Sequence, residues 1–224
     1  MKNFLPVLSN SELFSGMEPN SISSFLECMG AIIRKYSKDE IIFHMGDYTK
    51  QIAIILTGSV LTVKEDIWGR RHIVAMIKSG ETIAESFAAA KKSILTVNAM
   101  ANSDCELLFL NIDKLLSVCS SACDAHNRVI RNLISVLAEK NLKFNEKISH
   151  MSRRTTREKL LSYLSSEARI QKSLSFDIPF DRQQLADYLS VERAAMSVEL
   201  SKLQKDGLLK TKNKHFELLI DSQH

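Results

Sequence analysis

Residues 185 to 207 read "LADYLSVERAAMSVELSKLQKDG", and their apolar residues recur at intervals of three and four in two separate stretches. Such spacing places the apolar residues of each stretch on one face of a helix. The first predicted helix carries Leu185, Ala186 and Leu189 on that face, and the second carries Met196, Leu200 and Leu203. Only Ser190 and Val191 separate the two patterns, so the helices must cross steeply, as in a helix-turn-helix. The second helix is then held outward, which is typical of a helix that enters a groove.

The sequence on either side of this helix pair predicts a winged helix. Two residue pairs match capping boxes, which mark helix starts: Thr155 with Glu158, and Asp181 with Gln184. Apolar residues alternate from 174 to 180 and predict a strand, while Gly207 ends the second helix of the pair. Beyond it, "LLKTKNKHFELLI" has two strand-like halves around residues 212–214, which indicates a basic hairpin.

Upstream, residues from about 112 to 150 contain no Gly or Pro and predict one long helix. A second copy of the chain is the expected partner, because apolar residues repeat there as a heptad seam. The seam consists of Ile130, Ile134, Leu137, Asn141, Phe144, Ile148 and Met151. The lone amide of Asn141 favours a dimer, since such a residue fixes register. A second stripe, formed by Val129, Leu133 and Val136, is available to pack on the same chain, and one wide face buried in a monomer remains the alternative.

The first 80 residues hold six of the seven glycines, namely Gly16, Gly30, Gly46, Gly58, Gly69 and Gly80. The last four are spaced by 11 or 12 residues, which is typical of short strands joined by turns. We therefore expect a small antiparallel sandwich or barrel, with residues 95–97 and 107–110 as closing strands. The region before Ile33 is expected to be helical and packed against it. The whole chain is then of the α+β class.

Composition excludes several classes of protein. The 224 residues are 45% hydrophobic and 25% charged, as in ordinary globular proteins. No apolar run is long enough for a bilayer span, and the first residues lack a secretory signal, so we expect a cytoplasmic protein without a membrane partner. The four cysteines show no disulfide framework and are expected to be reduced thiols.

The positive charge is uneven along the chain. Residues 151 to 224 hold 13 Lys and Arg against 10 Asp and Glu, whereas residues 1 to 150 hold 17 against 16. A basic excess in the part that contains the helix-turn-helix suits a nucleic-acid partner, because neutralised phosphates release counterions.

Short motifs appear in a fixed order along the chain: Gly46-Asp47, Gly58-Ser59-Val60, Gly80-Glu81, and the stretch from Arg182 to Ala186. With these motifs, residues 14 to 219 resemble the CRP/FNR family of bacterial transcription regulators. The resemblance implies a cyclic-nucleotide-binding-like β-roll with a long dimerisation helix over residues 1–150. A winged helix-turn-helix DNA-binding domain is implied over residues 151–224. It also implies a homodimer that binds a palindromic double-stranded DNA site, is controlled by a small effector and acts with RNA polymerase.

In this family the recognition helix commonly begins with Arg-Glu and has a second Arg one turn later. Arg193 matches the first Arg, whereas Ala194 and Val198 replace the other two residues. Arg193 is expected to bind guanine O6 and N7, Ala194 and Val198 to contact thymine methyl groups, and Ser197 to bind a base or phosphate. We therefore expect a site rich in A·T beside a guanine. Contacts to the DNA backbone are expected from Arg182, Lys202, Lys212 and Lys214, although each lysine has a simple solvated alternative; Glu199 is expected to face inward or toward Arg193.

The resemblance also suggests where an effector would bind. The candidate residues are Gly80, Glu81, Lys91, Lys92, Ser93, Lys143 and Phe144. Members that bind cyclic AMP have an Arg followed by Ser or Thr for the phosphate, and this Arg is absent here. A lysine cannot reproduce its bidentate contact, so we expect an unidentified small molecule rather than cyclic AMP.

The oxygen-sensing branch of the family binds an iron-sulfur cluster through several N-terminal cysteines, and this chain has only Cys28 there. Cys119, Cys123 and His126 are spaced to share one helix face and represent an alternative redox, metal or haem sensor. The simpler alternative is that they are small core residues, since buried free cysteine is common.

The sequence also bears on two other classes of function. A metal enzyme in the roll would need His44 and His72 as ligands, but no properly spaced acid accompanies them, so the chain is not expected to be an enzyme. The other alternative is a ligand-binding module whose winged helix docks on a protein instead of DNA.

Overall fold

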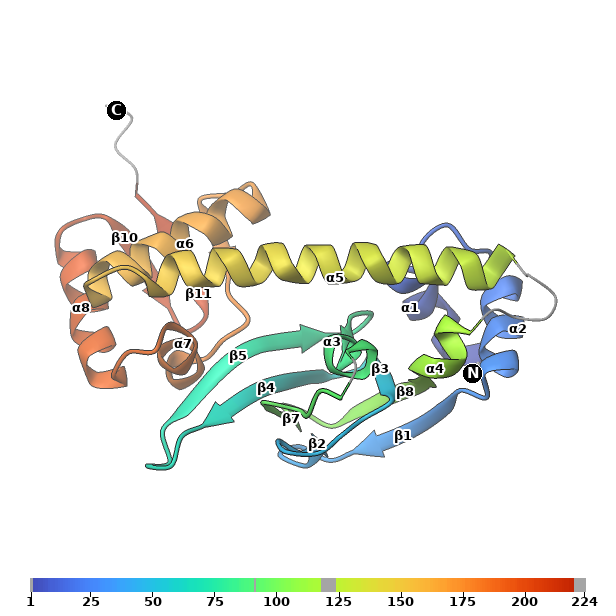
Figure 1. Cartoon of the computed structure of the whole chain (residues 1–224). Helices are drawn as coiled ribbons and strands as arrows, with labels where there is room; N and C mark the ends of the chain where they lie inside the picture. The colour runs from blue at the N-terminus through green and yellow to red at the C-terminus, as the bar shows by residue number, and fades with distance from the viewer. Residues whose placement is uncertain (1, 91, 118–123, 220–224) are drawn as a thin grey trace. The chain divides into compact units, whose positions relative to one another are not determined.

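The computed structural model describes residues 2–90, 92–117 and 124–219 (Figure 1). The chain divides into two compact units, and each is described by itself. The first unit comprises Met1–Arg70 and Val74–Leu142, and the second comprises Arg71–Ile73 and Lys143–His224. The division falls within the long helix, whereas the sequence placed the functional boundary near residue 150. That functional boundary stays a prediction.

Two antiparallel four-stranded sheets form the body of the first unit. One has the order β1 (Ile32–Tyr36), β8 (Cys105–Asn111), β3 (Gln51–Thr57) and β6 (Thr82–Ile83). The other has the order β2 (Ile41–Phe43), β7 (Asn98–Ala101), β4 (Ser59–Glu65) and β5 (Arg71–Lys78). A core that includes Phe43, Ile55 and Phe109 is buried from solvent. The predicted β-roll is confirmed.

The turn between β3 and β4 requires a glycine. Gly58 has a φ of +77°, and a Cβ at this position would lie 2.4 Å from the carbonyl oxygen of Asp104. Both the left-handed backbone and the close approach exclude a side chain. The glycine spacing in the sequence therefore marked a real strand boundary.

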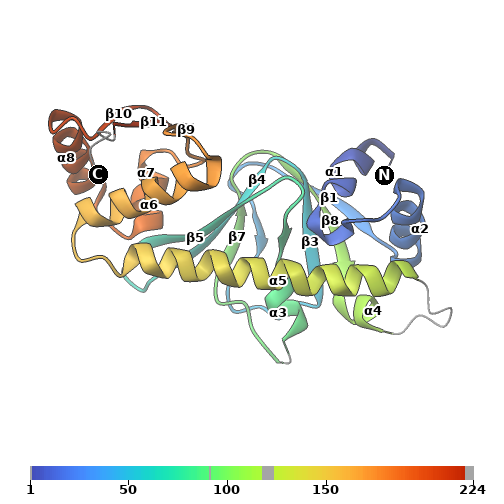
Figure 2. The same ribbon diagram turned by 90° about the horizontal axis from the view of Figure 1, so that it is seen from above.

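Helices cover part of this roll. They are α1 (Leu5–Ser9), α2 (Pro19–Met29), α3 (Glu85–Ala89) and α4 (Ile112–Leu116), with short 3-10 turns at Lys2–Phe4 and Glu12–Phe14. The long helix α5 (Asp124–Met151) packs against a second hydrophobic core of this unit through Val129 and Leu133, which are buried with Phe14 and Phe25. Figure 2 shows α1 and α2 beside the first turns of α5. The predictions of an N-terminal helical region and of a packing stripe on the long helix are thus confirmed.

Two expectations about this unit were wrong. Residues 95–97 form no strand. Just before them, Ile94 makes an isolated bridge to Tyr48, and β7 begins just after them at Asn98. The long helix does not begin near residue 112. Helix α4 ends at Leu116, Ser117 is extended with φ −72° and ψ 141°, and α5 begins at Asp124. The absence of Gly and Pro from this part of the sequence did not reveal that α4 ends before Ser117.

The second unit is a winged helix. Its elements are α6 (Thr156–Gln171), β9 (Ser175–Asp177), α7 (Arg182–Leu189), α8 (Arg193–Lys205), β10 (Leu209–Lys212) and β11 (His215–Leu218). The strands form a sheet of order β10-β11-β9. Leu164, Leu185, Leu203 and Phe216 are fully buried in its core. Both predicted capping boxes are present, at Thr155 for α6 and at Asp181 for α7.

No helix among the described residues is long and apolar enough to cross a bilayer.

Candidate nucleic-acid interface

The turn between α7 and α8 sets how α8 is presented. Ser190 has a left-handed backbone with a φ of +52°, and the amide of Val191 donates to the carbonyl oxygen of Ala186 at 3.0 Å. This ends α7 within one residue. Helix α8 then begins at Arg193 after the extended residue Glu192. The sharp change in direction predicted at the Ser-Val step is confirmed.

Helix α8 has one buried and one exposed face. Met196, Leu200 and Leu203 are buried and hold it in the winged helix. The four residues predicted to read bases are all exposed on the other side: Arg193, Ala194, Ser197 and Val198. The exposed face also includes Ala195, which the sequence analysis did not single out. A cation and small side chains are therefore gathered on one accessible surface.

Ser197 has part of its hydrogen-bonding capacity already used. Its hydroxyl donates to the carbonyl oxygen of Arg193 at 2.9 Å, one turn earlier in α8. The hydroxyl oxygen retains lone pairs and can accept a hydrogen bond from a base or water.

The residues expected to contact phosphates differ in how they are held. The guanidinium of Arg182 donates to Thr211 Oγ1 at 2.6 Å and lies 4.9 Å from the ring centre of Phe216. It is half-buried, and burial lowers its pKa. Lys214 Nζ donates to the carbonyl oxygen of Pro179 at 2.9 Å. Both side chains therefore tie the hairpin to the rest of the domain.

Lys202 and Lys212 are exposed. Lys202 Nζ lies 3.5 Å from Glu199 Oε2 on its own helix, a weak ion pair that leaves the ammonium accessible. These two lysines are placed to meet a polyanion without breaking a tertiary contact.

Arg157 of α6 anchors α8, and the sequence analysis missed it. Its guanidinium lies 3.3 Å from Glu199 Oε1 and 2.8 Å from Asp206 Oδ2. A hydrogen bond with Asp206 raises the pKa of Arg157, and the bond with Glu199 acts in the same direction. Glu199 is thus directed inward, as predicted, but toward Arg157 instead of Arg193. No local pattern indicates a contact between residues so far apart in sequence.

The hairpin of β10 and β11, which follows α8 in the chain, forms a tight wing. Asn213 occupies the turn with a left-handed φ of +55°, which asparagine tolerates better than most residues. The amide of Thr211 donates to Gln204 Oε1 at 3.2 Å, so the wing is linked to α8 directly. The position of Lys212 is therefore fixed relative to the recognition helix.

The predicted effector residues occupy different settings. Gly80 has a φ of +87° and its amide donates to the Ile55 carbonyl oxygen, while Glu81 accepts a hydrogen bond from the Lys78 amide at 2.8 Å. These two residues shape the turn from β5 to β6. Lys92 is exposed, Ser93 is half-buried, and Lys91 lies outside the described residues. Lys143 and Phe144 are exposed on α5 and belong to the second unit.

A buried ion pair in the first unit was also missed. Lys140 Nζ of α5 lies 2.7 Å from Glu85 Oε1 at the start of α3. The signal in the sequence was a single glutamate in the apolar stretch "TIAESFAAA". Its partner could not be identified, because it lies 55 residues further along the chain.

The cysteine and histidine hypothesis falls largely outside the described residues, since Cys119 and Cys123 do so. His126 is buried, with its ring centre 5.0 Å from that of Phe25 in an edge-on contact. No group of three metal-ligating side chains occurs within the described ranges. Of the other cysteines, Cys28 is exposed and Cys105 is buried, where burial raises the pKa of its thiol to about 11.

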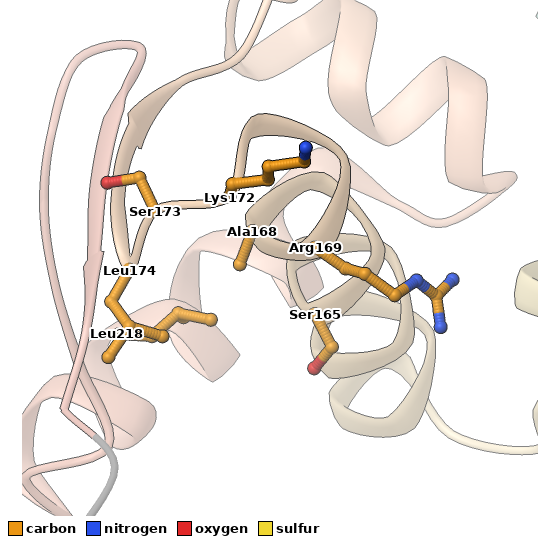
Figure 3. A pocket seen from close by; sticks show the side chains of 7 residues that line it. All are labelled: Ser165, Ala168, Arg169, Lys172, Ser173, Leu174 and Leu218. Carbon is orange, nitrogen blue, oxygen red and sulfur yellow. The ribbon is translucent and has the colours of Figure 1, made fainter.

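The second unit also contains a pocket of about 420 Å³ at the end of α6 (Figure 3). It is lined by Ser165, Ala168, Arg169, Lys172, Ser173, Leu174 and Leu218. The guanidinium of Arg169 points away from the two leucines in this view and lies 3.1 Å from Glu146 Oε1. None of the predicted DNA-binding residues lines this pocket.

Comparison with known proteins identifies both parts of the chain. A model of the cyclic nucleotide-binding domain matches residues 33–122, and a model of the Crp-like helix-turn-helix domain matches residues 158–221. The chain is 21% identical to the transcriptional activator protein FnrL of Cereibacter sphaeroides, over 84% of this chain and 76% of that protein. It is 23% identical to the CRP-like protein Clp of Xanthomonas euvesicatoria pv. vesicatoria, over 81% of each.

Solved structures share the fold. The c-di-GMP-responsive global regulator CLP of Xanthomonas campestris matches with a TM-score of 0.73 at 21% identity, covering 91% of this chain and all 100% of that one. FixK2 from Bradyrhizobium japonicum matches with a TM-score of 0.65 at 22% identity, covering 85% and 93%.

A cyclic nucleotide-binding domain followed by a Crp-like helix-turn-helix defines a transcription regulator with a DNA-binding domain. This chain belongs to the CRP/FNR family of such regulators. The resemblance and the fold class expected from the sequence are both confirmed.

Proposed function

We propose that the protein is a homodimeric, sequence-specific DNA-binding regulator of transcription that acts in the cytoplasm and whose recognition helix is α8. The observation that carries this proposal is the exposed face of α8. It combines Arg193 with the small side chains of Ala194, Ser197 and Val198, while the opposite face is fully used for packing. A helix with small outward residues can approach the base edges of a major groove closely.

The chemistry of this face defines a preferred site. Arg193 donates two hydrogen bonds to guanine O6 and N7, the commonest specific contact in the major groove. Ala194 and Val198 contact thymine methyl groups, and Val198 is 55% exposed, so its methyl groups are available. The half-site is therefore a guanine next to A·T pairs. Lys202 and Lys212 neutralise phosphates and set orientation without reading sequence. Arg182 and Lys214 act mainly by positioning the wing.

The long helix α5 supplies the dimer interface. Ile134 and Ile148 of the predicted seam are 64% and 60% exposed, whereas Val129 and Leu133 on the packing stripe are buried. Such exposure of large apolar side chains in a heptad pattern favours pairing with a second α5. Two recognition helices would then meet half-sites about 34 Å apart on a palindrome. RNA polymerase is the expected partner of the bound dimer.

A small effector bound in the first unit is the proposed regulator of this dimer. The Xanthomonas campestris relative is described as responsive to c-di-GMP, and the family model is that of a cyclic nucleotide-binding domain. No arginine occurs between Gly80 and Val97 of this chain. A phosphate clamp of the cyclic AMP type is therefore not expected here.

Selection of double-stranded DNA from a random pool tests this function. The purified chain should enrich palindromic sites that contain a guanine beside A·T pairs, and gel shifts should show binding that weakens as salt increases. The same chain mixed with protein extract is the comparison for the alternative of a protein-docking module. Absence of any duplex binding, or enrichment of no sequence at all, would contradict the proposal.

A further inference from the structure

Glu85 is a carboxylate buried within the sensor unit. It opens α3 directly after β6 and is 3% exposed, between the buried residues Ile83 and Ala88. An ionised carboxylate in such surroundings requires a partner, because transfer from water to an apolar interior is costly. Its partner is Lys140 of α5, whose Nζ lies 2.7 Å from Glu85 Oε1.

Lys140 makes a second contact at the other end of the same turn. Its Nζ donates to the carbonyl oxygen of Thr82 at 2.5 Å. Thr82 and Glu85 flank Ala84, whose left-handed backbone has a φ of +66° and which is not a glycine. One ammonium group therefore spans this tight turn and contacts both the Glu85 carboxylate and the Thr82 carbonyl oxygen.

The Thr82–Glu85 turn is also linked to an inner strand of the β1-β8-β3-β6 sheet. Strand β6 pairs with β3, with Ile54 opposite Thr82 and Ala53 opposite Ile83. Lys140 thus connects α5 through this turn to a strand in the middle of the roll. An ordinary surface ion pair, such as Lys35 with Glu106 at the edge of the sheet, makes no such connection, because the Lys35 side chain is 80% exposed.

Hydrogen-bonding capacity remains at this site. Glu85 Oε2 and Thr82 Oγ1 are both buried and have no hydrogen-bond partner among the described residues. The carboxylate is therefore balanced in charge but only half satisfied in hydrogen bonds. Such a group holds its ammonium partner strongly and loses much when that partner is removed.

We infer that Lys140 acts as a built-in ligand of the sensor. The ammonium of α5 closes the Thr82–Glu85 turn and fixes it to the long helix, a connection that requires no small molecule. In the protein without an effector, the Thr82–Glu85 turn is therefore already joined to α5. An effector acts by competing with Lys140 for the Glu85 carboxylate, and it must present its own hydrogen-bond donors to do so. This regulation rests on the proposed function, whereas the connection itself does not.

Hydrogen exchange of the purified full chain tests the connection without DNA. Lys140→Met should accelerate exchange of amides in residues 82–89 by roughly 100-fold, since removing one member of a buried pair opens that segment. Lys140→Arg keeps the charge and should change the rates by less than about tenfold. The matched control Lys35→Met removes an exposed pair and should leave this segment unchanged. Equal exchange in the wild type and in Lys140→Met would overturn the inference.

Rescue by an added amine separates charge from packing. In Lys140→Ala, n-propylammonium chloride should slow exchange of residues 82–89, because it replaces the missing end of the lysine. Tetramethylammonium chloride and 1-propanol, at the same concentration, should not, since neither can donate from an ammonium. Equal recovery with all three additives would show that only volume matters and would overturn the role of the ammonium.

A DNA-binding measurement tests whether the protein is active without an effector. Wild-type protein that has been unfolded, desalted and refolded should bind its selected duplex within about threefold of the untreated protein, because no ligand is needed for the resting state. Loss of binding that returns only with an added small molecule would overturn the inference. If no duplex is bound under any condition, the proposed function fails instead, and the exchange measurements still decide whether Lys140 holds the turn.

Discussion

Arg193 is the only cation in the first turn of α8, and it stands among residues too small to compete with it for a base. In the proposed DNA complex, discrimination at a guanine position would therefore depend on this one planar donor group. In that proposed complex, the small neighbouring residues would let the helix approach the groove and would add methyl contacts, which are weaker and less directional than a bidentate hydrogen bond. Sequence preference and general affinity are thus assigned to different side chains.

Replacing Arg193 with Ala is expected to weaken binding to the selected site by about 5- to 150-fold, which corresponds to the 1 to 3 kcal/mol of a bidentate guanine contact. Binding to unrelated duplexes should change much less. Lys212→Ala is the contrasting variant, since loss of a phosphate contact should weaken all sequences alike and reduce the salt dependence by about one unit of slope. Fluorescence anisotropy on specific and random duplexes measures both. Equal losses on the two duplexes for Arg193→Ala would contradict base reading.

His150 near the end of α5 is a second residue with a measurable role. It is buried, its Nδ1 lies 2.8 Å from Ser162 Oγ of α6, and its ring packs edge-on against Tyr163. Burial lowers the pKa of His150, and Arg153 and Arg169 act in the same direction, whereas Glu146 and Glu167 oppose them. The neutral imidazole is therefore the form that joins the two helices.

The second unit should lose stability as the pH falls below the ordinary histidine value of about 6.5. The unfolded chain then binds a proton that folded His150 resists, so the free energy of unfolding rises with pH in this range and levels off above it. His150→Gln should flatten this slope, and the exposed His44→Gln of the other unit should not. Urea unfolding between about pH 5 and 7.5 measures the effect. An unchanged slope in His150→Gln would show that another group is responsible.

At the scale of elements, the winged helix is specified by signals that lie close together in the chain. The α6 and α7 starts are set by capping boxes at Thr155 and Asp181, and Gly207 follows the C-cap residue of α8 with a positive φ of +72°. Each helix end is thus determined by residues within three or four positions of it. A fault in such a signal should affect stability more than the DNA-binding chemistry.

Asp181→Ala provides the test for α7. The Asp181 carboxylate accepts a hydrogen bond from the Gln184 amide at 2.8 Å, and alanine would leave that first-turn donor without its cap. The loss should lower the free energy of unfolding by about 1 kcal/mol. Asp181→Asn retains an acceptor and should cost only a few tenths of that. Denaturant unfolding compares the three proteins. Equal stability of the alanine variant and the wild type would mean that solvent replaces the cap fully.

The elements that the sequence predicted well share this local character. Capping boxes, the period of three and four residues, and the spacing of glycines all act within a few positions, and they correctly predicted α6, α7, α8 and the roll. The start of the long helix was wrong, because a lack of Gly and Pro indicates only that a helix is permitted. The prediction of a strand at residues 95–97 was wrong for a similar reason, since a short apolar run is compatible with a loop as well as a strand.

The candidate site was predictable only in part. The exposed face of α8 follows from its helical period, so Arg193 and its neighbours could be chosen from the sequence alone. The contacts of Arg157 with Asp206 and of Lys140 with Glu85 join residues 49 and 55 positions apart, and only the tertiary fold brings them together. For the proposed effector site, the sequence singled out the Gly80-Glu81 pair, which forms a turn. The buried glutamate is Glu85, four residues after Glu81.

For the whole molecule, α5 carries both buried and exposed apolar side chains along one helix. Val129 and Leu133 bury one face in the core of the first unit, while Ile134 and Ile148 leave another face open to solvent. The exposed face is too apolar to be a simple solvated surface. Pairing of two chains through it would place two recognition helices on one DNA molecule, and the second then binds at high effective concentration.

The double variant Ile134→Asp and Ile148→Asp should therefore convert the proposed dimer to a monomer, because each charge would have to be buried against its own copy in the partner. Sedimentation should show half the mass. Affinity for the palindromic site should fall by about 100-fold or more, toward that of a single half-site. Ser135→Asp places the same charge about 100° around the helix from Ile134 and should leave both properties intact. A wild type that sediments as a monomer, or a double variant that keeps full affinity for the palindrome, would show that α5 does not join two DNA-reading domains.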